Sequence, residues 1–291
     1  MRFGIVILPE HRWSVAAEKW QTAESLGFDH LWTYDHLAWR SLADGPWFGT
    51  VPTLTAAATV TSTARLGTFV ASPNFRHPVS FARELLSLDD ISGGRFTLGV
   101  GSGGIGFDAT VLGGQVLPPA ARFRRLKEFV ELLELLFLED HVNYAGEFFT
   151  AVDARTVPGF RAPTGLPLVL AANGPKAMGL AVEYGSGWAT TGNGGDTVEQ
   201  WWSNLRVLTE KFNEVLAATD RIPGSIQRYL QLDSGPVFSL SSVGAFDDAV
   251  GRAAELGFTD VVTHWPRPDD WYAGKEATLF EAAAKHLTPR A

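Results

Sequence analysis

The chain has 291 residues, of which 45% are hydrophobic and 19% are charged, as in a packed globular protein and unlike a disordered one. Its formal net charge of -8 provides no basic field for a polyanion, which argues against nucleic acid as a partner. The absence of cysteine excludes disulfides, thiolate metal sites and a cysteine nucleophile.

The apolar segments are too short to span a membrane. The first, residues 3–8, ends at Pro9 and is also too short for the core of a signal peptide. The longest, residues 129–138, contains Glu131 and Glu134 and falls far below the roughly 20 apolar residues that a membrane helix needs. We therefore expect a cytoplasmic protein without membrane association.

Short apolar or β-branched runs alternate with longer helical patterns along the chain. In chain order, the expected strands are residues 3–8, 30–34, 66–71, 96–100, 168–172, 187–190, 229–232 and 260–264. The helices expected after them are residues 15–26, 52–62, 79–88, 122–138, 176–184, 198–217, 245–256 and 277–286. Residues 142–158 interrupt this rhythm, because their alternating pattern indicates a hairpin or a loop excursion.

Strict alternation of strands and helices predicts parallel strands, and eight such units predict a closed (β/α)8 barrel with a short insertion. A doubly wound open sheet is the alternative. It would need fewer strands or a boundary near the middle, where no linker-like segment is found. We therefore expect a single domain over residues 1–291.

Chemistry in such a barrel comes from the carboxyl ends of the strands and the loops that follow. Hydroxyls, amides and glycines dominate the ends of the fourth to sixth strands, and such groups hold a phosphate through neutral donors and backbone N–H groups. These residues are Ser102, Gly103, Gly104, Asn173, Gly174, Pro175, Thr190, Thr191, Gly192 and Asn193. Aromatic and imidazole side chains after the second and eighth strands suit a pocket wall for a flat molecule. They are His36, Trp39, Trp47, Phe48, His264 and Trp265.

Each of these features also has a purely structural explanation. A glycine after a strand, such as Gly192, is often required only by the turn. Asp35 can cap the next segment and His36 can be a satisfied histidine, although the strand-end position favours function for His36. Trp201 and Trp202 lie on an expected helix, where packing or a subunit contact is favoured over ligand binding.

Residues 99–104 match the G-x-G-x-x-G pattern of dinucleotide-binding proteins. That site needs a helix that begins within the glycines, whereas the next expected helix begins near Arg122. No acidic residue ends a strand about 20 residues later, as the pattern also requires. We therefore do not expect a Rossmann-type site.

Other barrel chemistries also fit poorly. The seven histidines form neither a His-x-His nor a His-Glu-x-x-His pattern, so no metal site is expected. The fourth and sixth strands carry no carboxylates at their ends for a glycosidase, although Glu10, Asp35 and Asp233 keep that alternative open. A bound cofactor is then the natural source of reactivity.

Two segments resemble the signature of the luciferase-like monooxygenase superfamily. They are residues 66–78 (LGTFVASPNFRHP) and residues 88–101 (LDDISGGRFTLGVG). Residues 34–36 and 172–175 stand where that family has matching strand ends, so the resemblance covers nearly the whole chain. It implies a bacterial-luciferase-like TIM barrel with an insertion, which binds FMN or its deazaflavin analogue, coenzyme F420.

In the F420-dependent branch, the resemblance implies roles for individual residues. A bulge with a non-prolyl cis peptide bond backs the ring system, and the matching step is Phe69-Val70. Asp35 and His36 would face the reactive edge of the deazaflavin. Residues on the substrate side would be Trp39, His264 and Trp265. Those that hold the cofactor would be Phe69, Val70, Ala71, Ser102, Asn173, Gly174, Pro175, Thr190, Thr191 and Gly192.

The expected function is that of an F420-dependent oxidoreductase, which transfers a hydride between C5 of F420 and a small organic substrate, with His36 orienting or protonating the reacting group. The alternatives are an FMN-dependent two-component monooxygenase and a non-catalytic flavin-binding member. Gly104 replaces the acidic proton donor of the sugar-phosphate dehydrogenases of this family, which argues against a glucose-6-phosphate-type activity. The resemblance also implies a homodimer.

Overall fold

The computed structural model describes residues 1–222 and 224–290. Its barrel strands form a closed sheet in the order β1-β10-β9-β8-β7-β4-β3-β2, which confirms the predicted (β/α)8 fold. The barrel strands are β1 (Arg2–Val6), β2 (His30–Thr33), β3 (Arg65–Thr68), β4 (Phe96–Val100), β7 (Leu168–Ala171), β8 (Gly187–Thr190), β9 (Gln227–Gln231) and β10 (Asp260–His264).

A helix follows each barrel strand, as the sequence pattern predicts. These helices are α1 (Trp13–Ser25), α2 (Thr50–Val60), α3 (Pro78–Ser92), α4 (Pro119–Leu138), α5 (Pro175–Tyr184), α6 (Val198–Ala217), α7 (Val243–Glu255) and α8 (Glu276–His286). Short 3-10 turns lie in the loops, namely η1 (Arg40–Asp44), η2 (Phe107–Ala109), η3 (Leu232–Ser234) and η4 (Ser239–Ser241). Within the described residues, none of the helices has both the length and the apolar character to cross a bilayer.

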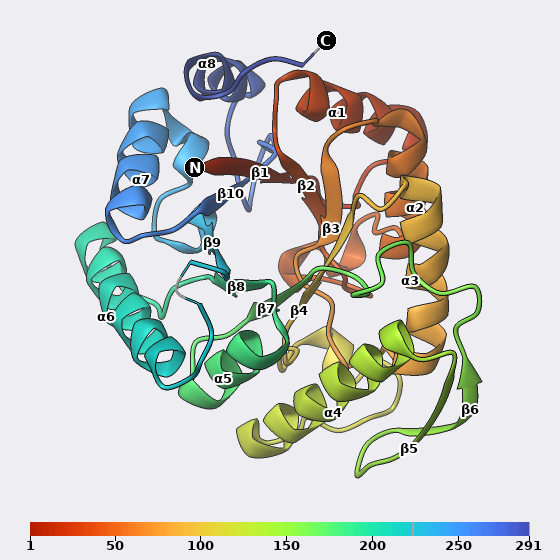
Figure 1. Cartoon of the computed structure of the whole chain (residues 1–291). Coiled ribbons are helices and arrows are strands. Elements are labelled where there is room, and N and C mark those ends of the chain that lie inside the picture. The colour runs from red at the N-terminus through yellow and green to blue at the C-terminus, as the bar shows by residue number, and fades with distance from the viewer. Residues whose placement is uncertain (223, 291) are drawn as a thin grey trace. The chain divides into compact units, whose positions relative to one another are not determined.

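The chain divides into two compact units by its internal contacts. Unit 1 consists of Met1–Leu8, Glu18–Trp32 and Val169–Ala291, and unit 2 consists of Pro9–Ala17 and Thr33–Leu168. In unit 1, α6 packs on β8 through Trp188 and Phe212, whose parallel rings lie 4.1 Å apart between centroids. Figure 1 shows α5, α6 and α7 following one another on the outer side of β8, β9 and β10. Burial of these large rings anchors the helices of unit 1 to its strands.

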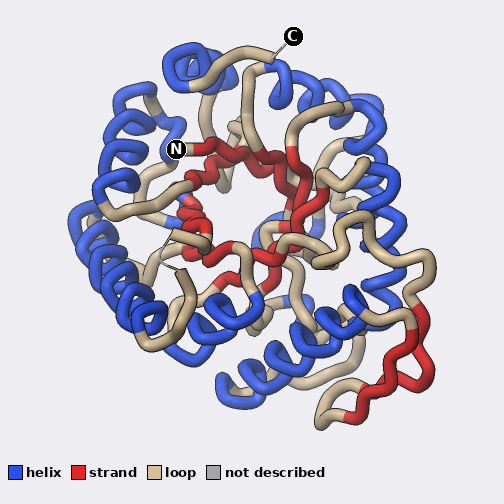
Figure 2. Tube along the Cα trace, viewed as in Figure 1, coloured by secondary structure: helices blue, strands red, loops and turns tan. Residues whose placement is uncertain are grey.

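Unit 2 contains the insertion that the alternating pattern predicted. Strands β5 (His141–Ala145) and β6 (Thr150–Arg155) form an antiparallel hairpin, which Figure 2 shows outside the barrel strands and beside α4. The carboxylate of Glu128 on α4 accepts backbone N–H groups of Glu147 and Phe148 in the hairpin turn, both at 2.8 Å. The hairpin is therefore fastened to α4 by charge-assisted hydrogen bonds.

Most element boundaries differ from the expected ones by one to three residues, and two of the differences have a clear local cause. Helix α3 continues to Ser92 because Gly93, in the left-handed conformation with φ 68°, supplies its carboxyl-terminal cap. Strand β3 ends at Thr68 and pairs again with β4 only through a bridge between Ala71 and Val100.

Candidate functional site

The break after β3 is the bulge that the family resemblance predicted. The peptide bond between Phe69 and Val70 is cis, as expected. The N–H of Phe69 donates to the carbonyl of Thr33 at 2.9 Å, whereas the N–H of Ala71 returns to the carbonyl of Gly99 at 2.8 Å. The backbone at residues 69 and 70 therefore leaves the β3–β4 ladder at the carboxyl end of β3.

His36 lies three residues after Thr33, the last residue of β2, and 29% of its side chain is exposed. Its Nδ1 lies 2.5 Å from Oδ2 of Asp108, a buried residue in η2. The other oxygen of Asp108 accepts the backbone N–H of Leu37 at 2.8 Å. Because a carboxylate only accepts hydrogen bonds, Nδ1 of His36 is the donor. Nε2 of His36 has no hydrogen-bond partner among the residues that the structure describes, so it can accept a proton from a bound molecule.

Asp35 is buried beside His36 and is bound to Arg76. Its two carboxylate oxygens accept from Nη2 and Nε of Arg76 at 2.8 and 3.1 Å. Arg76 also donates to Glu84 on α3 at 2.9 Å. This bidentate pair compensates the buried charge of Asp35 and fixes the chain at the end of β2.

Aromatic side chains gather around His36 in unit 2. The ring of Tyr34 lies 5.8 Å from His36 and 5.2 Å from Trp39, both edge to face. Trp47 stacks on Trp39 at 6.5 Å and donates its indole N–H to the carbonyl of His36 at 2.8 Å. Trp39 and Trp47, two members of the predicted aromatic set, therefore lie near the imidazole together with Tyr34.

The polar ends of β7 and β8 form a small hydrogen-bonded ring in unit 1. The hydroxyl of Thr190 donates to Oδ1 of Asn173 at 2.7 Å and accepts the N–H of Gly192 at 3.0 Å. The Nδ2 of Asn173 closes the ring on the carbonyl of Gly192 at 2.7 Å. Thr191 is exposed, as are Gly174 and Pro175 at the start of α5. The structure thus brings together these predicted cofactor residues.

Trp201 on α6 contacts the loop after β8 and accounts for the glycine at position 192. A Cβ at Gly192, where φ is +79°, would lie 2.5 Å from Nε1 of Trp201. That indole nitrogen donates to the carbonyl of Thr191 at 3.3 Å. Gly192 therefore meets a packing requirement in addition to the conformational one of the turn.

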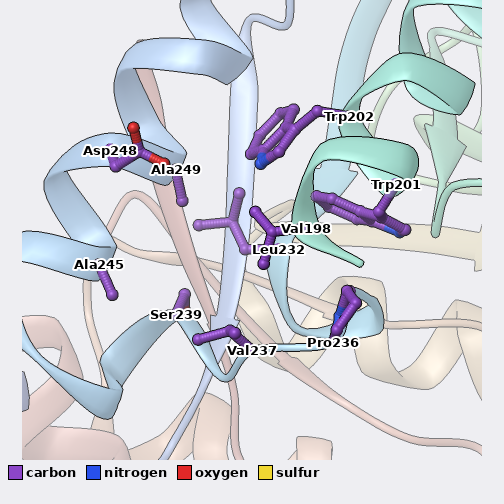
Figure 3. A pocket seen from close by; sticks show the side chains of 11 residues that line it. Val198, Trp201, Trp202, Leu232, Pro236, Val237, Ser239, Ala245, Asp248 and Ala249 are labelled. Carbon is purple, nitrogen blue, oxygen red and sulfur yellow. The ribbon is translucent and has the colours of Figure 1, made fainter. Parts of the chain in front are cut away.

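Trp201 and Trp202 also border a cavity of about 220 Å³ within unit 1 (Figure 3). It lies between α6, α7 and the segment that joins β9 to α7. Its lining is predominantly apolar and consists of Val198, Trp201, Trp202, Leu232, Gly235, Pro236, Val237, Ser239, Ala245, Asp248 and Ala249. The two tryptophans thus have the packing role expected of a helix face and also line a hollow.

His264 and Trp265 at the end of β10 are both buried. Nδ1 of His264 lies 2.7 Å from Asp233, and the ring stacks on Tyr272 with centroids 3.6 Å apart. Burial lowers the pKa of His264 and outweighs the opposing effect of Asp233, so the ring is neutral near pH 7. The indole N–H of Trp265 donates to Glu276 on α8 at 2.7 Å. The polar atoms of both side chains are engaged by their own unit.

The loop after β4 begins with the half-buried Ser102 and the exposed Gly104. No α-helix begins within residues 99–104, since α4 starts at Pro119, which agrees with the rejection of a dinucleotide-binding loop. Sequence reasoning did not single out Asp108, which comes from this loop. It lies 72 residues from His36 and belongs to no periodic pattern.

Comparison with solved structures supports this fold. An F420-dependent secondary alcohol dehydrogenase, solved with an F420-acetone adduct, superposes with a TM-score of 0.81 at 17% identity, over 99% of this chain and 98% of that one. At this identity, the similarity shows the fold alone.

Sequence comparison finds named enzymes among the relatives of this chain. The chain is 34% identical over 176 residues to the F420-dependent glucose-6-phosphate dehydrogenase of Amycolatopsis mediterranei, covering 60% of this chain and 52% of the relative. It is 32% identical over 187 residues to the 5,10-methylenetetrahydromethanopterin reductase of Archaeoglobus fulgidus, covering 64% of this chain and 52% of that one. The chain thus spans about half the length of these curated relatives. The model of the luciferase-like monooxygenase family matches residues 1–233, and the chain therefore belongs to that family.

Proposed function

We propose that this protein is an F420-dependent oxidoreductase that transfers a hydride between the deazaflavin and a small organic substrate. The observation that carries the proposal is the partly exposed imidazole of His36, whose Nδ1 is held by Asp108 while Nε2 is available. Oxidation of an alcohol or reduction of a carbonyl needs one proton moved for each hydride, and an imidazole can accept or donate it. Relatives that use F420 support this choice of cofactor.

The residues at the ends of β7 and β8 fit the phosphate side of such a cofactor. The Asn173–Thr190–Gly192 ring keeps the loop after β8 in place. The exposed first turn of α5 presents the backbone N–H groups of the residues that follow Pro175. The exposed Thr191 adds a hydroxyl. Phe69, Val70, Ala71 and Ser102 would contact the ring system. When bound, F420 supplies the carbon that accepts or donates the hydride.

The chain's own residues then have separate tasks. His36 holds or accepts the proton at Nε2. Asp35, whose two oxygens bind Arg76, fixes the strand end and does not transfer protons itself. Trp39 and its aromatic neighbours exclude water from the substrate. We assign His264 and Trp265 a supporting role, because their polar atoms are already bonded within unit 1.

Binding titrations of the purified protein with F420 and with FMN, followed by fluorescence, test this proposal. We expect tight binding of F420 and weak binding of FMN. Thr190→Val should weaken F420 binding about tenfold, because it removes both hydrogen bonds of the hydroxyl while keeping the side-chain shape. Preference for FMN would instead identify a two-component monooxygenase. Binding of F420 without turnover of any alcohol or carbonyl would identify a non-catalytic member.

The resemblance also leads us to propose a homodimer. Sedimentation velocity at working concentration checks this, and a single species with the mass of one chain, 31.6 kDa, would refute it.

A further inference from the structure

Two arginines of α4 converge on the loop that follows β4. Nη1 of Arg122 donates to the carbonyl of Gly103 at 3.0 Å, and Nη2 of Arg125 donates to Oδ1 of Asn74 at 2.5 Å. Nδ2 of Asn74 in turn donates to the carbonyl of Gly104 at 3.2 Å. Both guanidinium groups therefore reach one small patch at the carboxyl ends of β3 and β4, within unit 2.

The positive charge of this pair is not compensated by an acidic residue. Among the described residues, neither Arg122 nor Arg125 forms an ion pair, and both of the bonds above end on neutral oxygens. Arg124, on the same stretch of helix, instead binds both oxygens of Glu147 at 2.8 Å. The chain carries a net charge of -8, so an uncompensated cationic pair is not explained by a shortage of carboxylates.

The two charges are also partly removed from water. The Nε atoms of Arg122 and Arg125 are buried without a hydrogen-bond partner. Burial, and next the neighbouring charge of Arg122, lower the pKa of Arg125, although a guanidinium stays protonated near neutral pH. Burying like charges side by side costs free energy that a bound anion would offset.

Each guanidinium retains a donor that an incoming group can reach. The second terminal nitrogen, Nη2 of Arg122 and Nη1 of Arg125, makes no hydrogen bond to any part of the chain that the structure describes. Neither atom is among the fully buried polar atoms that lack partners, so each retains some contact with solvent. The adjacent Gly104 is exposed and has no side chain to cover them.

We propose that Arg122 and Arg125 form a subsite for a carboxylate or phosphate group of the molecule bound at the ends of β3 and β4. A guanidinium group can donate two parallel hydrogen bonds to two oxygens of a carboxylate or of a phosphate. The anion belongs either to the substrate or to the cofactor, and this part of the inference rests on the proposed function. If the anion belongs to the substrate, the enzyme acts on an alcohol or ketone that also carries a carboxylate or phosphate group.

Calorimetric titration of the cofactor-free protein with inorganic phosphate tests the subsite itself. We expect Arg122→Gln/Arg125→Gln to lose at least tenfold in phosphate affinity at this site, whereas Arg124→Gln, whose partner is the exposed Glu147, changes less than twofold. Arg122→Lys/Arg125→Lys keeps both charges and should bind phosphate better than the glutamine variant. Thr190→Val identifies phosphate that binds instead at the loop after β8, because binding at that loop should weaken in this variant and binding at the arginine pair should not. Circular dichroism and the thermal midpoint verify that each variant is folded.

The outcomes separate the alternatives. Undetectable phosphate binding by the wild-type protein, or equal affinity in the folded double glutamine variant, would overturn the subsite and leave the arginines only to hold the loop. Weaker binding of F420 with unchanged binding of the same deazaflavin lacking its phosphate would assign the subsite to the cofactor. Unchanged F420 binding with competition between phosphate and substrate would assign it to the substrate. If phosphate binding depends on the two arginines but the protein does not bind F420, the subsite is supported and the proposed cofactor is refuted.

Discussion

At the scale of single residues, the chemistry available to His36 depends on Asp108. Asp108 accepts from Nδ1 of His36 and from the N–H of Leu37, so it fixes both the ring and the chain beside it. A carboxylate on Nδ1 favours the neutral tautomer that bears its proton there, which leaves the lone pair on Nε2. Asp108 is thus a positioning residue that acts through His36.

We predict that Asp108→Asn lowers turnover about 10²-fold with a smaller change in KM, because an asparagine amide can donate to Nδ1 and stabilise the other tautomer. Steady-state kinetics with F420 measures this change. Nitrogen-15 NMR of the histidine rings, assigned with His36→Gln, should report protonated Nδ1 in the wild type and a shifted tautomer in the variant. Asp90→Asn, at an exposed surface pair, is the control. An unchanged ring spectrum in Asp108→Asn would remove Asp108 from this role.

At the scale of elements, the pairing of β3 with β4 depends on a close approach of their backbones. The hydroxyl of Thr68 donates to the carbonyl of Gly99 at 2.8 Å and accepts its N–H at 3.1 Å. A Cβ at Gly99 would lie 2.1 Å from the carbonyl oxygen of Thr68. The bulge at residues 69 and 70 follows at once, so Gly99 also determines how the chain reaches the end of β3.

We predict that Gly99→Ala lowers the free energy of unfolding by about 3 kcal/mol or more, because the strands must separate to admit the methyl group. Gly106→Ala is the matched control: its Cβ would meet no atom within 4 Å, so its effect should stay within about 0.5 kcal/mol. Urea unfolding measures both variants. Equal stability of the two would contradict the close approach.

At the scale of the whole molecule, two buried groups make stability depend on pH. The unfolded His264 takes up a proton near its ordinary pKa of 6.5, whereas burial lowers the pKa of the folded residue. At a pH between the pKa values of the folded and unfolded states, the unfolded state binds more protons, so stability falls as the pH drops below about 6.5. Burial raises the pKa of Asp260, but hydrogen bonds from His30 and Arg2 lower it more, to below its ordinary value of 3.8. The stability that ionised Asp260 contributes is lost only as the pH falls below about 3.8.

We predict that the free energy of unfolding is lower at pH 5 than at pH 7.5, by up to about 2 kcal/mol from His264 alone. His264→Gln should lower stability overall and flatten this part of the profile. Urea unfolding at both pH values, in the wild type and the variant, checks the slope. The same slope in both proteins would show that His264 remains equally protonated in the folded and unfolded states.

The sequence by itself determined the architecture and, to within about three residues, where the strands end. Hydrophobic periodicity is local, so it located the alternating strands and helices and predicted a hairpin or loop excursion over residues 142–158, where the structure has a hairpin over residues 141–155. Topology then placed His36, Asn173 and Thr190 at the carboxyl ends of their strands. The resemblance added the cis step at Phe69-Val70, which the structure has.

Only the tertiary structure decided which groups meet. Asp108 contacts His36, Arg76 contacts Asp35 and Trp201 packs against Gly192, and the sequence periodicity specifies none of these pairs. The burial of His264 likewise follows from packing against Tyr272, in a segment with no regular pattern. Side-chain partners depend on distances in space, which the order of residues along a loop does not specify.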